Sequence, residues 1–158
     1  MNQSDLTPND FECLHEAAQK IFETLVKKIQ VRLPALNAIL GRTRTVKFPL
    51  YSHMTFEDKT RPGIDPVVVG IDVRVDTGAI LIQGHIMGEE TGTAHFDLPN
   101  QELPFGTEQA VLLDQTTKAA QQLADNTMPV LLRLFGDSMS VPLSPAAVLP
   151  ATARKANV

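Results

Sequence analysis

The sequence predicts an α+β fold: a long N-terminal helix, a four-stranded antiparallel meander with one face covered by helices, and C-terminal helices. Three observations support this order. Residues 7–33 carry apolar side chains at spacings of three and four, which is the helical period. Residues 67–98 contain three apolar runs separated by short stretches of turn-forming residues. A second helical pattern, built on unusually small side chains, begins at Thr107.

The first helix has a well-marked start. Thr7 can act as its N-cap, Pro8 occupies the first helical position, and Asp10 can complete a capping box with Thr7. Apolar residues then recur on one broad face, while oppositely charged pairs four apart, such as Glu16 with Lys20, lie on the other face. This segment should therefore pack its apolar face against the rest of the domain.

The next segments predict the change from helix to sheet. Residues 34–40 follow a proline-terminated helix and are expected to form a kinked continuation or a separate short helix, ended by Gly41. From residue 45 the apolar period changes to two, which predicts a strand over residues 45–51, and Pro49 places that strand at a sheet edge. Residues 57–66 are rich in charge, Pro and Gly and are expected to form a loop.

Three further strands are expected over residues 67–75, 79–87 and 93–98, joined as an antiparallel meander. A three-residue loop between the first two would place polar residues in the core. A loop of two or four residues around Thr77 and Gly78 instead aligns the apolar residues of both strands on one face. We therefore expect the apolar pattern to decide the register.

The C-terminal third predicts more helix and then a tail. The helix that opens near Thr107 should be interrupted by Pro129, and a further short helix should end at Gly136. Residues 1–136 are expected to form a single domain. Residues 137–158 are rich in Pro, Ala and Ser and are expected to form a mostly disordered tail.

The sheet register also predicts a mixed face opposite the covered one. Pairing Ile86 with Ala94 and Gly84 with Phe96 places His85 directly across from His95. Three interpretations of this face remain open: an ordinary solvated surface, a dimer or partner interface, and a metal or acid–base site built from His85, His95 and Asp97. We do not expect a metal, because side chains two apart on one strand diverge. The candidate partner-binding residues are Asp72, Arg74, Leu81, Gln83, His85, Met87, His95 and Asp97.

One short motif carries a resemblance to an enzyme family. Asp76, Thr77 and Gly78 resemble the catalytic Asp-Thr-Gly of retroviral-type aspartic proteases, and residues 134–137 are similar to that family's later apolar pair followed by Gly. The resemblance implies a dimer in which two such carboxylates share a proton and activate water. We expect a hairpin turn instead, because these are common turn residues and residues 107–126 have a helical pattern where those enzymes have strands.

Composition argues against several function classes. The formal net charge is −4 and the sequence has no basic run, so nucleic acid is not an expected partner. No apolar run reaches the roughly 20 residues of a membrane helix, and the N-terminus does not read as a targeting segment, so we expect a cytoplasmic protein. The lone Cys13 excludes an internal disulfide framework. We expect no cofactor and no catalytic residue.

The function we infer from sequence is that of a non-enzymatic protein-binding module, an adaptor or chaperone-like protein acting as a homodimer. The helix–sheet–helix layout resembles small secretion-chaperone architectures, at the level of fold alone. The alternative is a small-molecule-binding protein or hydrolase. Its site would lie between the sheet and the helices, or on the face that carries His85, His95 and Asp97.

Overall fold

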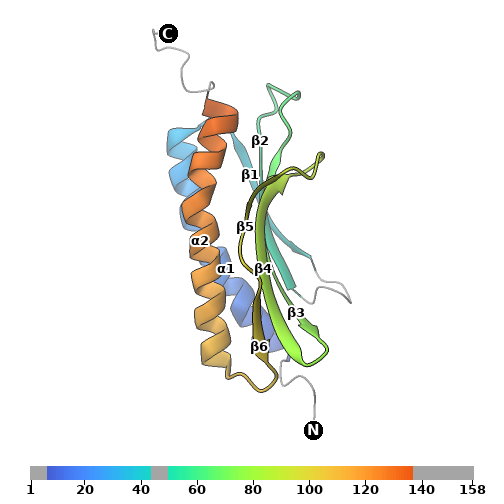
Figure 1. Ribbon diagram of the computed structural model, residues 1–158. Coiled ribbons are helices and arrows are strands. Elements are labelled where there is room, and N and C mark those ends of the chain that lie inside the picture. Colours follow the sequence, from blue (N-terminus) through green and yellow to red (C-terminus); the bar gives the residue numbers. More distant parts are fainter. Residues whose placement is uncertain (1–6, 44–49, 137–158) are drawn as a thin grey trace.

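Two helices run side by side in the same direction over one face of an antiparallel sheet (Figure 1). The computed structural model describes residues 7–43 and 50–136. The α+β class and the order helix, sheet, helix are confirmed. The elements are α1 (Pro8–Arg32), β1 (Asn37–Thr43), β2 (Leu50–Glu57), β3 (Val67–Asp76), β4 (Ala79–Gly88), β5 (Ala94–Asp97), β6 (Gln101–Pro104) and α2 (Gln109–Phe135).

Helix α1 begins as the sequence predicts. The Thr7 hydroxyl accepts a hydrogen bond from the Asp10 amide at 3.2 Å, and the Asp10 carboxylate accepts one from the Thr7 amide at 2.8 Å. These bonds satisfy two backbone donors that the first turn of a helix leaves without partners. One stripe of the helix is buried from Phe11 to Ile29.

The segment after α1 is a strand, so the expectation of a further short helix over residues 34–40 was wrong. Ala38 and Leu40 alternate with Asn37 and Ile39, and they pair with Phe56 and Met54 of β2. Alternate residues on a strand face the same side, so Ala38 and Leu40 reach the core, where they pack against its buried side chains. A period-two pattern only four residues long was too short to compete with the helical interpretation.

Strand β2 lies between β1 and β3, so it is not an edge strand. Pro49, on which the edge prediction rested, and the first part of the strand expected over residues 45–51 lie outside the described residues. The described part of the strand continues to Glu57, with buried and partly exposed side chains alternating along it. Strand β1 forms that edge of the sheet.

The hairpin between β3 and β4 confirms the register that the apolar pattern predicts. Asp76 pairs with Ala79, which leaves Thr77 and Gly78 as a two-residue loop. Gly78 has a φ of 77°, a conformation that glycine adopts without strain. The Asp76 carboxylate accepts a hydrogen bond from the Thr77 amide at 2.7 Å. The Asp-Thr-Gly segment is thus a structural turn, as expected.

The far side of the sheet differs from the expected meander in two ways. Strand β6, which the sequence interpretation lacked, pairs with β4 alongside residues 79–82. Strand β5 pairs with the other half of β4, and Ile86 lies opposite Phe96 instead of Ala94. A register irregularity between Ile86 and Met87 accounts for one residue of this two-residue shift, because a bulge inserts one extra residue into one strand.

Helix α2 continues through Pro129, so the predicted interruption was wrong. A proline inside a helix costs about 3 kcal/mol through a lost hydrogen bond and a steric clash. Val130, Leu131 and Phe135 are buried beyond it, and their burial offsets that cost. The expected tail, residues 137–158, lies outside the described residues.

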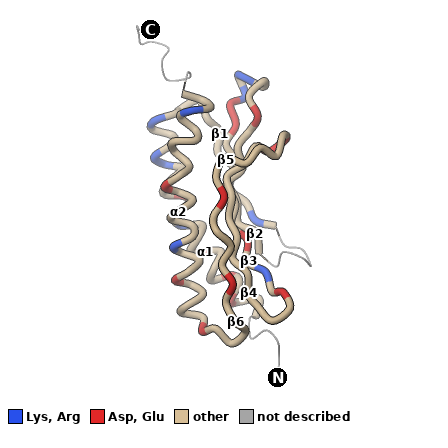
Figure 2. Tube along the Cα trace, in the orientation of Figure 1, with Lys and Arg blue, Asp and Glu red and all other residues tan. Residues whose placement is uncertain are grey.

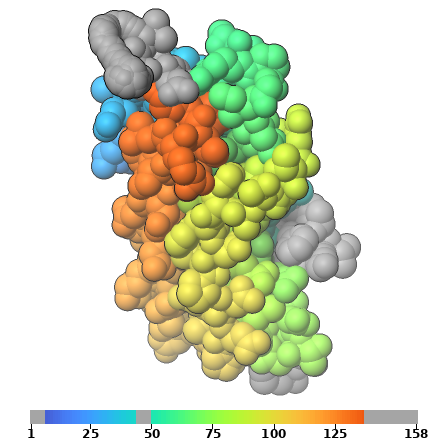
Figure 3. Space-filling model, turned by 45° about the horizontal axis from the view of Figure 1, so that its top comes forward, coloured from blue at the N-terminus to red at the C-terminus, as the bar shows by residue number. Residues whose placement is uncertain are grey.

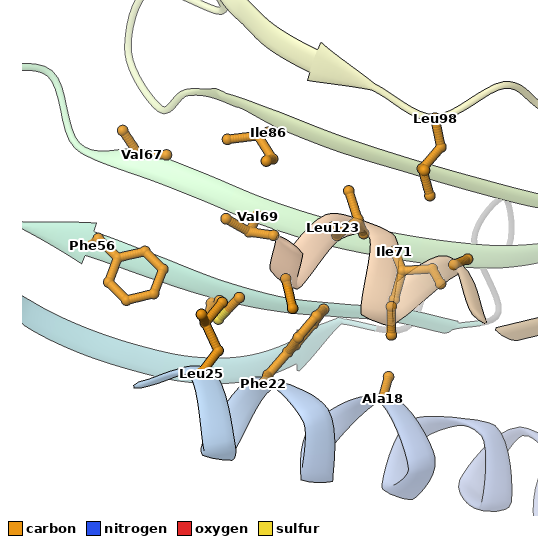
Figure 4. Close-up of a cluster of buried hydrophobic side chains, with 14 of the residues drawn as sticks. Ala18, Phe22, Leu25, Phe56, Val67, Val69, Ile71, Ile86, Leu98 and Leu123 are labelled. Carbon is orange, nitrogen blue, oxygen red and sulfur yellow. The ribbon is translucent and has the colours of Figure 1, made fainter. Parts of the chain in front are cut away.

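The core lies between the helices and the sheet (Figure 4). Phe22 from α1 points into the same layer as Phe56, Val69 and Ile71 of the sheet, and Leu123 of α2 reaches it from the other helix. Figure 3 shows α2 packed alongside the chain of β5 and β6. The helices therefore cover one face of the sheet and leave the opposite face free of any described helix.

Candidate functional site on the uncovered sheet face

The face of the sheet turned away from the helices, here called the outer face, carries seven of the eight candidate partner-binding residues. Val67, Val69 and Ile71 point into the core, so the residues between them on β3 point outward. Cross-strand pairing places Asp72 beside Gln83, Arg74 beside Leu81, and Asp97 beside His85. The residues brought together here are Asp72, Arg74, Leu81, Gln83, His85, Met87 and Asp97.

His95 does not belong to the outer face, which corrects the prediction that it lies across from His85. Its Nδ1 lies 3.1 Å from Nη2 of Arg133 on α2, so its ring turns toward the helices. The bulge at β5 explains the difference, because it re-aims the side chain next to the inserted residue. Asp97 takes the place opposite His85.

A row of polar rings crosses the centre of the outer face. The Tyr51 hydroxyl lies 2.9 Å from Nε2 of His85, and the Tyr51 and His53 rings stack with centroids 4.9 Å apart. Gly70 belongs to β3, which lies between β2 and β4, and its missing side chain makes room for the Tyr51 ring. A Cβ at this position would lie 2.4 Å from the Tyr51 hydroxyl. The Tyr51 ring thus bridges three strands by lying across a glycine.

Asp72 is the most unusual residue of this face. It is only 6% exposed, and its Oδ1 has no hydrogen-bond partner in the described structure. Burial raises the pKa of its carboxyl to about 6, although the charge of Arg74 acts in the opposite direction. Burial, with a contribution from the Asp72 charge, also raises the pKa of Tyr51 to about 12. The buried oxygen thus lacks the hydrogen bond that such a group normally accepts.

The chemistry of the row favours binding over catalysis. Asp97, His85 and Tyr51 follow one another as carboxylate, imidazole and hydroxyl. An activated nucleophile needs a lowered pKa or a strong neighbouring base, yet the pKa of Tyr51 is raised and burial lowers the pKa of His85 despite the charge of Asp97. The hydroxyl therefore keeps its proton, and the imidazole is a neutral donor and acceptor.

A metal site does not assemble from the predicted residues. With His95 turned toward α2, only His85 and Asp97 of the proposed ligand set remain on the outer face. Within the part of the chain that the structure describes, no group of three His, Cys, Asp or Glu side chains could hold a metal ion.

The described residues line two hollows on the helix side of the molecule. One, of about 100 Å³, lies between the sheet and α2 and is lined in part by Ile82, Leu98 and Ala119. This volume is below the roughly 300 Å³ at which ligand sites begin, so the predicted alternative of a site between sheet and helices gains no support. The other, of about 500 Å³, is a groove lined by α1 and α2 residues alone, with Lys20 and Asp125 on opposite helices.

Sequence reasoning missed Tyr51, His53 and Gly70. Two signals were present. A glycine within a Val-rich strand marks a place where another group approaches the backbone closely, as the Tyr51 ring does at Gly70. The alternation through β2 separates Tyr51 and His53 from the buried Leu50 and Ser52, which assigns both rings to the outer face.

Substituting Gly70 with alanine is expected to displace Tyr51 and break its hydrogen bond to His85. The new Cβ would overlap the ring, and forcing this shift should lower the free energy of unfolding by about 1 kcal/mol. Loss of the covering ring should also raise the pKa of His85 toward its ordinary value, as measured by NMR titration. Gly63→Ala is the matched control, because nothing lies within 4 Å of a Cβ there. An unchanged His85 titration would contradict the bridging role of Tyr51.

Comparison with known proteins identifies no relative: no family model, no curated protein and no solved structure matches the chain. Within residues 7–43 and 50–136, no helix combines the length and apolar character needed to cross a membrane.

Proposed function

We propose that this protein is a non-enzymatic protein-binding module that acts through the outer face of its sheet. The observation that carries the proposal is Asp72: a buried carboxylate oxygen without a partner, on a sheet face that no described helix covers. Apolar Leu81 and Met87 lie on the same face among hydrogen-bonding side chains, which is the usual composition of a non-obligate protein interface. Adaptor or chaperone-like activity in the cytoplasm is the role we infer.

The proposal includes a homodimer. Strand β1 is an edge strand of seven residues, and Ile39 on it is 51% exposed. An edge strand can pair with its own copy across a two-fold axis, which would join the outer faces of two protomers into one surface. Light scattering coupled to size exclusion should therefore give a dimer for the wild type and a folded monomer for Ile39→Lys. A monomeric wild type would remove the homodimer from the proposal.

Binding can be tested with a library of short synthetic peptides of varied composition, probed with the full-length protein. We expect the wild type to retain a subset of the peptides and Leu81→Arg to lose that subset, because the new cation replaces an apolar side chain on this face. Met87→Arg provides a second variant in case the first unfolds. Val31→Arg, at an 84% exposed position of α1, is the matched control and should bind like the wild type.

The outcome decides between the two function classes. If the wild type retains no peptide, or if both outer-face variants bind the same subset as the wild type while folded, the outer face is not a protein-binding surface. The small-molecule alternative would then be tested at the groove between α1 and α2.

A further inference from the structure

The charges of the outer face are strongly unbalanced. Among the described residues, five carboxylates lie on this face and Arg74 is the one basic side chain (Figure 2 shows the acidic residues along the strands). The five carboxylates belong to Glu57, Asp72, Asp76, Asp97 and Glu102. Both histidines of the face, His53 and His85, have lowered pKa values through burial and so add no positive charge near neutral pH. The described residues of this face therefore present a net negative field to a partner.

The carboxylates are arranged around one strand. Along β4, Leu81, Gln83, His85 and Met87 form an outward stripe, here called the β4 stripe. Asp72 lies beside Gln83 on the β3 side of the stripe. Glu102 lies beside Leu81 and Asp97 beside His85 on the opposite side. The stripe thus carries an apolar residue at each end, polar residues in the middle, and acidic residues along both margins.

The stripe has the length of a short extended peptide. Residues on one face of a strand are about 6.8 Å apart, so Leu81 and Met87 are separated by about 20 Å. An extended segment of about seven residues covers that length. One set of alternate side chains would face the stripe and contact Met87 and the 8% exposed Leu81, while the long basic side chains between them would bend back over the margins to reach the carboxylates.

Asp72 adds an observation independent of the general acidity. It is more than nine-tenths buried, and its Oδ1 has no hydrogen-bond partner in the described structure. A buried carboxylate oxygen normally accepts a hydrogen bond, and leaving it without one costs free energy. A guanidinium or ammonium group brought to this face would supply the missing donor once the Asp72 carboxyl turns outward, because the oxygen itself has almost no exposed surface.

From this arrangement we propose that the β4 stripe binds an extended polypeptide segment in which Lys or Arg residues alternate with apolar residues. This inference rests on the proposed protein-binding function and specifies its partner. The apolar side chains pack on Leu81 and Met87, and the basic side chains pair with Asp72, Asp97 and Glu102. The Arg74 charge beside Leu81 disfavours a basic residue at that end of the segment.

Fluorescence anisotropy with two labelled peptides of about eight residues tests the inference. One peptide alternates Lys with Leu, and the other alternates Glu with Leu. We expect the full-length protein to bind the Lys peptide and not the Glu peptide, with affinity that falls as salt is added. Asp97→Asn and Glu102→Gln should each weaken binding about two- to fivefold. Asp72→Asn should weaken it about tenfold.

Controls separate this site from general attraction to an acidic protein. Asp125→Asn on α2 removes one negative charge far from the stripe and should leave the affinity unchanged. Spermine, a cation without apolar side chains, should compete poorly with the Lys peptide. Equal binding of both peptides, equal loss in Asp125→Asn, or full competition by spermine would each overturn the inference.

The test also separates the inference from the function on which it rests. Suppose that the protein retains a subset of library peptides that is not enriched in Lys or Arg, and that Leu81→Arg loses this subset. The proposed protein-binding function then stands, and the inference of a basic partner is wrong. If neither the library nor the two labelled peptides bind, both fail.

Discussion

Replacing Phe22 with alanine is expected to lower the free energy of unfolding by about 3 to 5 kcal/mol. The Phe22 ring is fully buried between α1 and the sheet, in the same layer as Phe56 and Leu123 (Figure 4). Removing it loses the transfer free energy of the ring and leaves a cavity that close-packed neighbours cannot fill. Urea unfolding followed by circular dichroism measures the change.

The control for this prediction lies on the same helix. Val31 is 84% exposed, so Val31→Ala removes no core packing and should leave the free energy of unfolding nearly unchanged. The loss in Phe22→Ala is a large fraction of the 5 to 15 kcal/mol that typically stabilises a domain. A loss below about 1 kcal/mol would mean that α1 does not cover the sheet as described.

The elements with a long, regular pattern were predictable from the sequence. Helix α1 has three capping signals and a full apolar stripe, and it was found within a residue of its ends. The hairpin of β3 and β4 was also correct, because a three-residue loop would have placed Gln83 and His85 on the core side. In these elements several independent sequence signals agree, so only one helix position and one strand register fit them all.

The errors occurred where a local rule competed with tertiary packing. Proline normally ends a helix, but burial beyond Pro129 carries α2 to Phe135. Strand β1 depends on pairing with β2 for its stability, and this pairing is invisible in residues 37–43 alone. Short strands such as β6 carry the same ambiguity, which explains the undercount of strands.

For the candidate site, the sequence predicted most of the residues that share the outer face. It did not predict how their side chains are arranged on it. Alternation on β3 and β4 was enough to place Asp72, Leu81 and His85 on one face. The bulge that removes His95 from that face follows from a register irregularity that no residue type signals clearly. The unpartnered oxygen of Asp72 could not be foreseen, because hydrogen bonding depends on side-chain positions in three dimensions.

Asp72→Asn is expected to stabilise the free protein by about 2 kcal/mol at pH 7. A pKa raised from 3.8 to about 6 corresponds to about 3 kcal/mol against the ionised carboxylate, and solvent screening at an open sheet face reduces this to about 2 kcal/mol. The amide has a similar shape and no charge to desolvate. The melting temperature at pH 7 should rise by about 4 to 8 °C.

The pH dependence tests the cause of this stabilisation. Because the folded-state pKa of Asp72 lies above the unfolded-state value, the folded protein holds the proton more tightly between about pH 4 and pH 6. The favourable contribution is complete below pH 4 and is lost as the pH rises through 6. Asp58 and Asp65 have lowered pKa values and contribute in the opposite sense, so the informative quantity is the difference between wild type and variant.

That difference should be small at pH 4, grow toward pH 6 and then level off. A constant difference, or a destabilised Asp72→Asn, would show that the carboxylate is well satisfied in the folded protein. A more stable variant that binds the Lys peptide less well would mean that Asp72 lowers the stability of the free protein in return for its contribution to binding. Higher stability together with weaker binding is expected when a binding residue is replaced. Neutralising a carboxylate with a structural role would instead make the protein less stable.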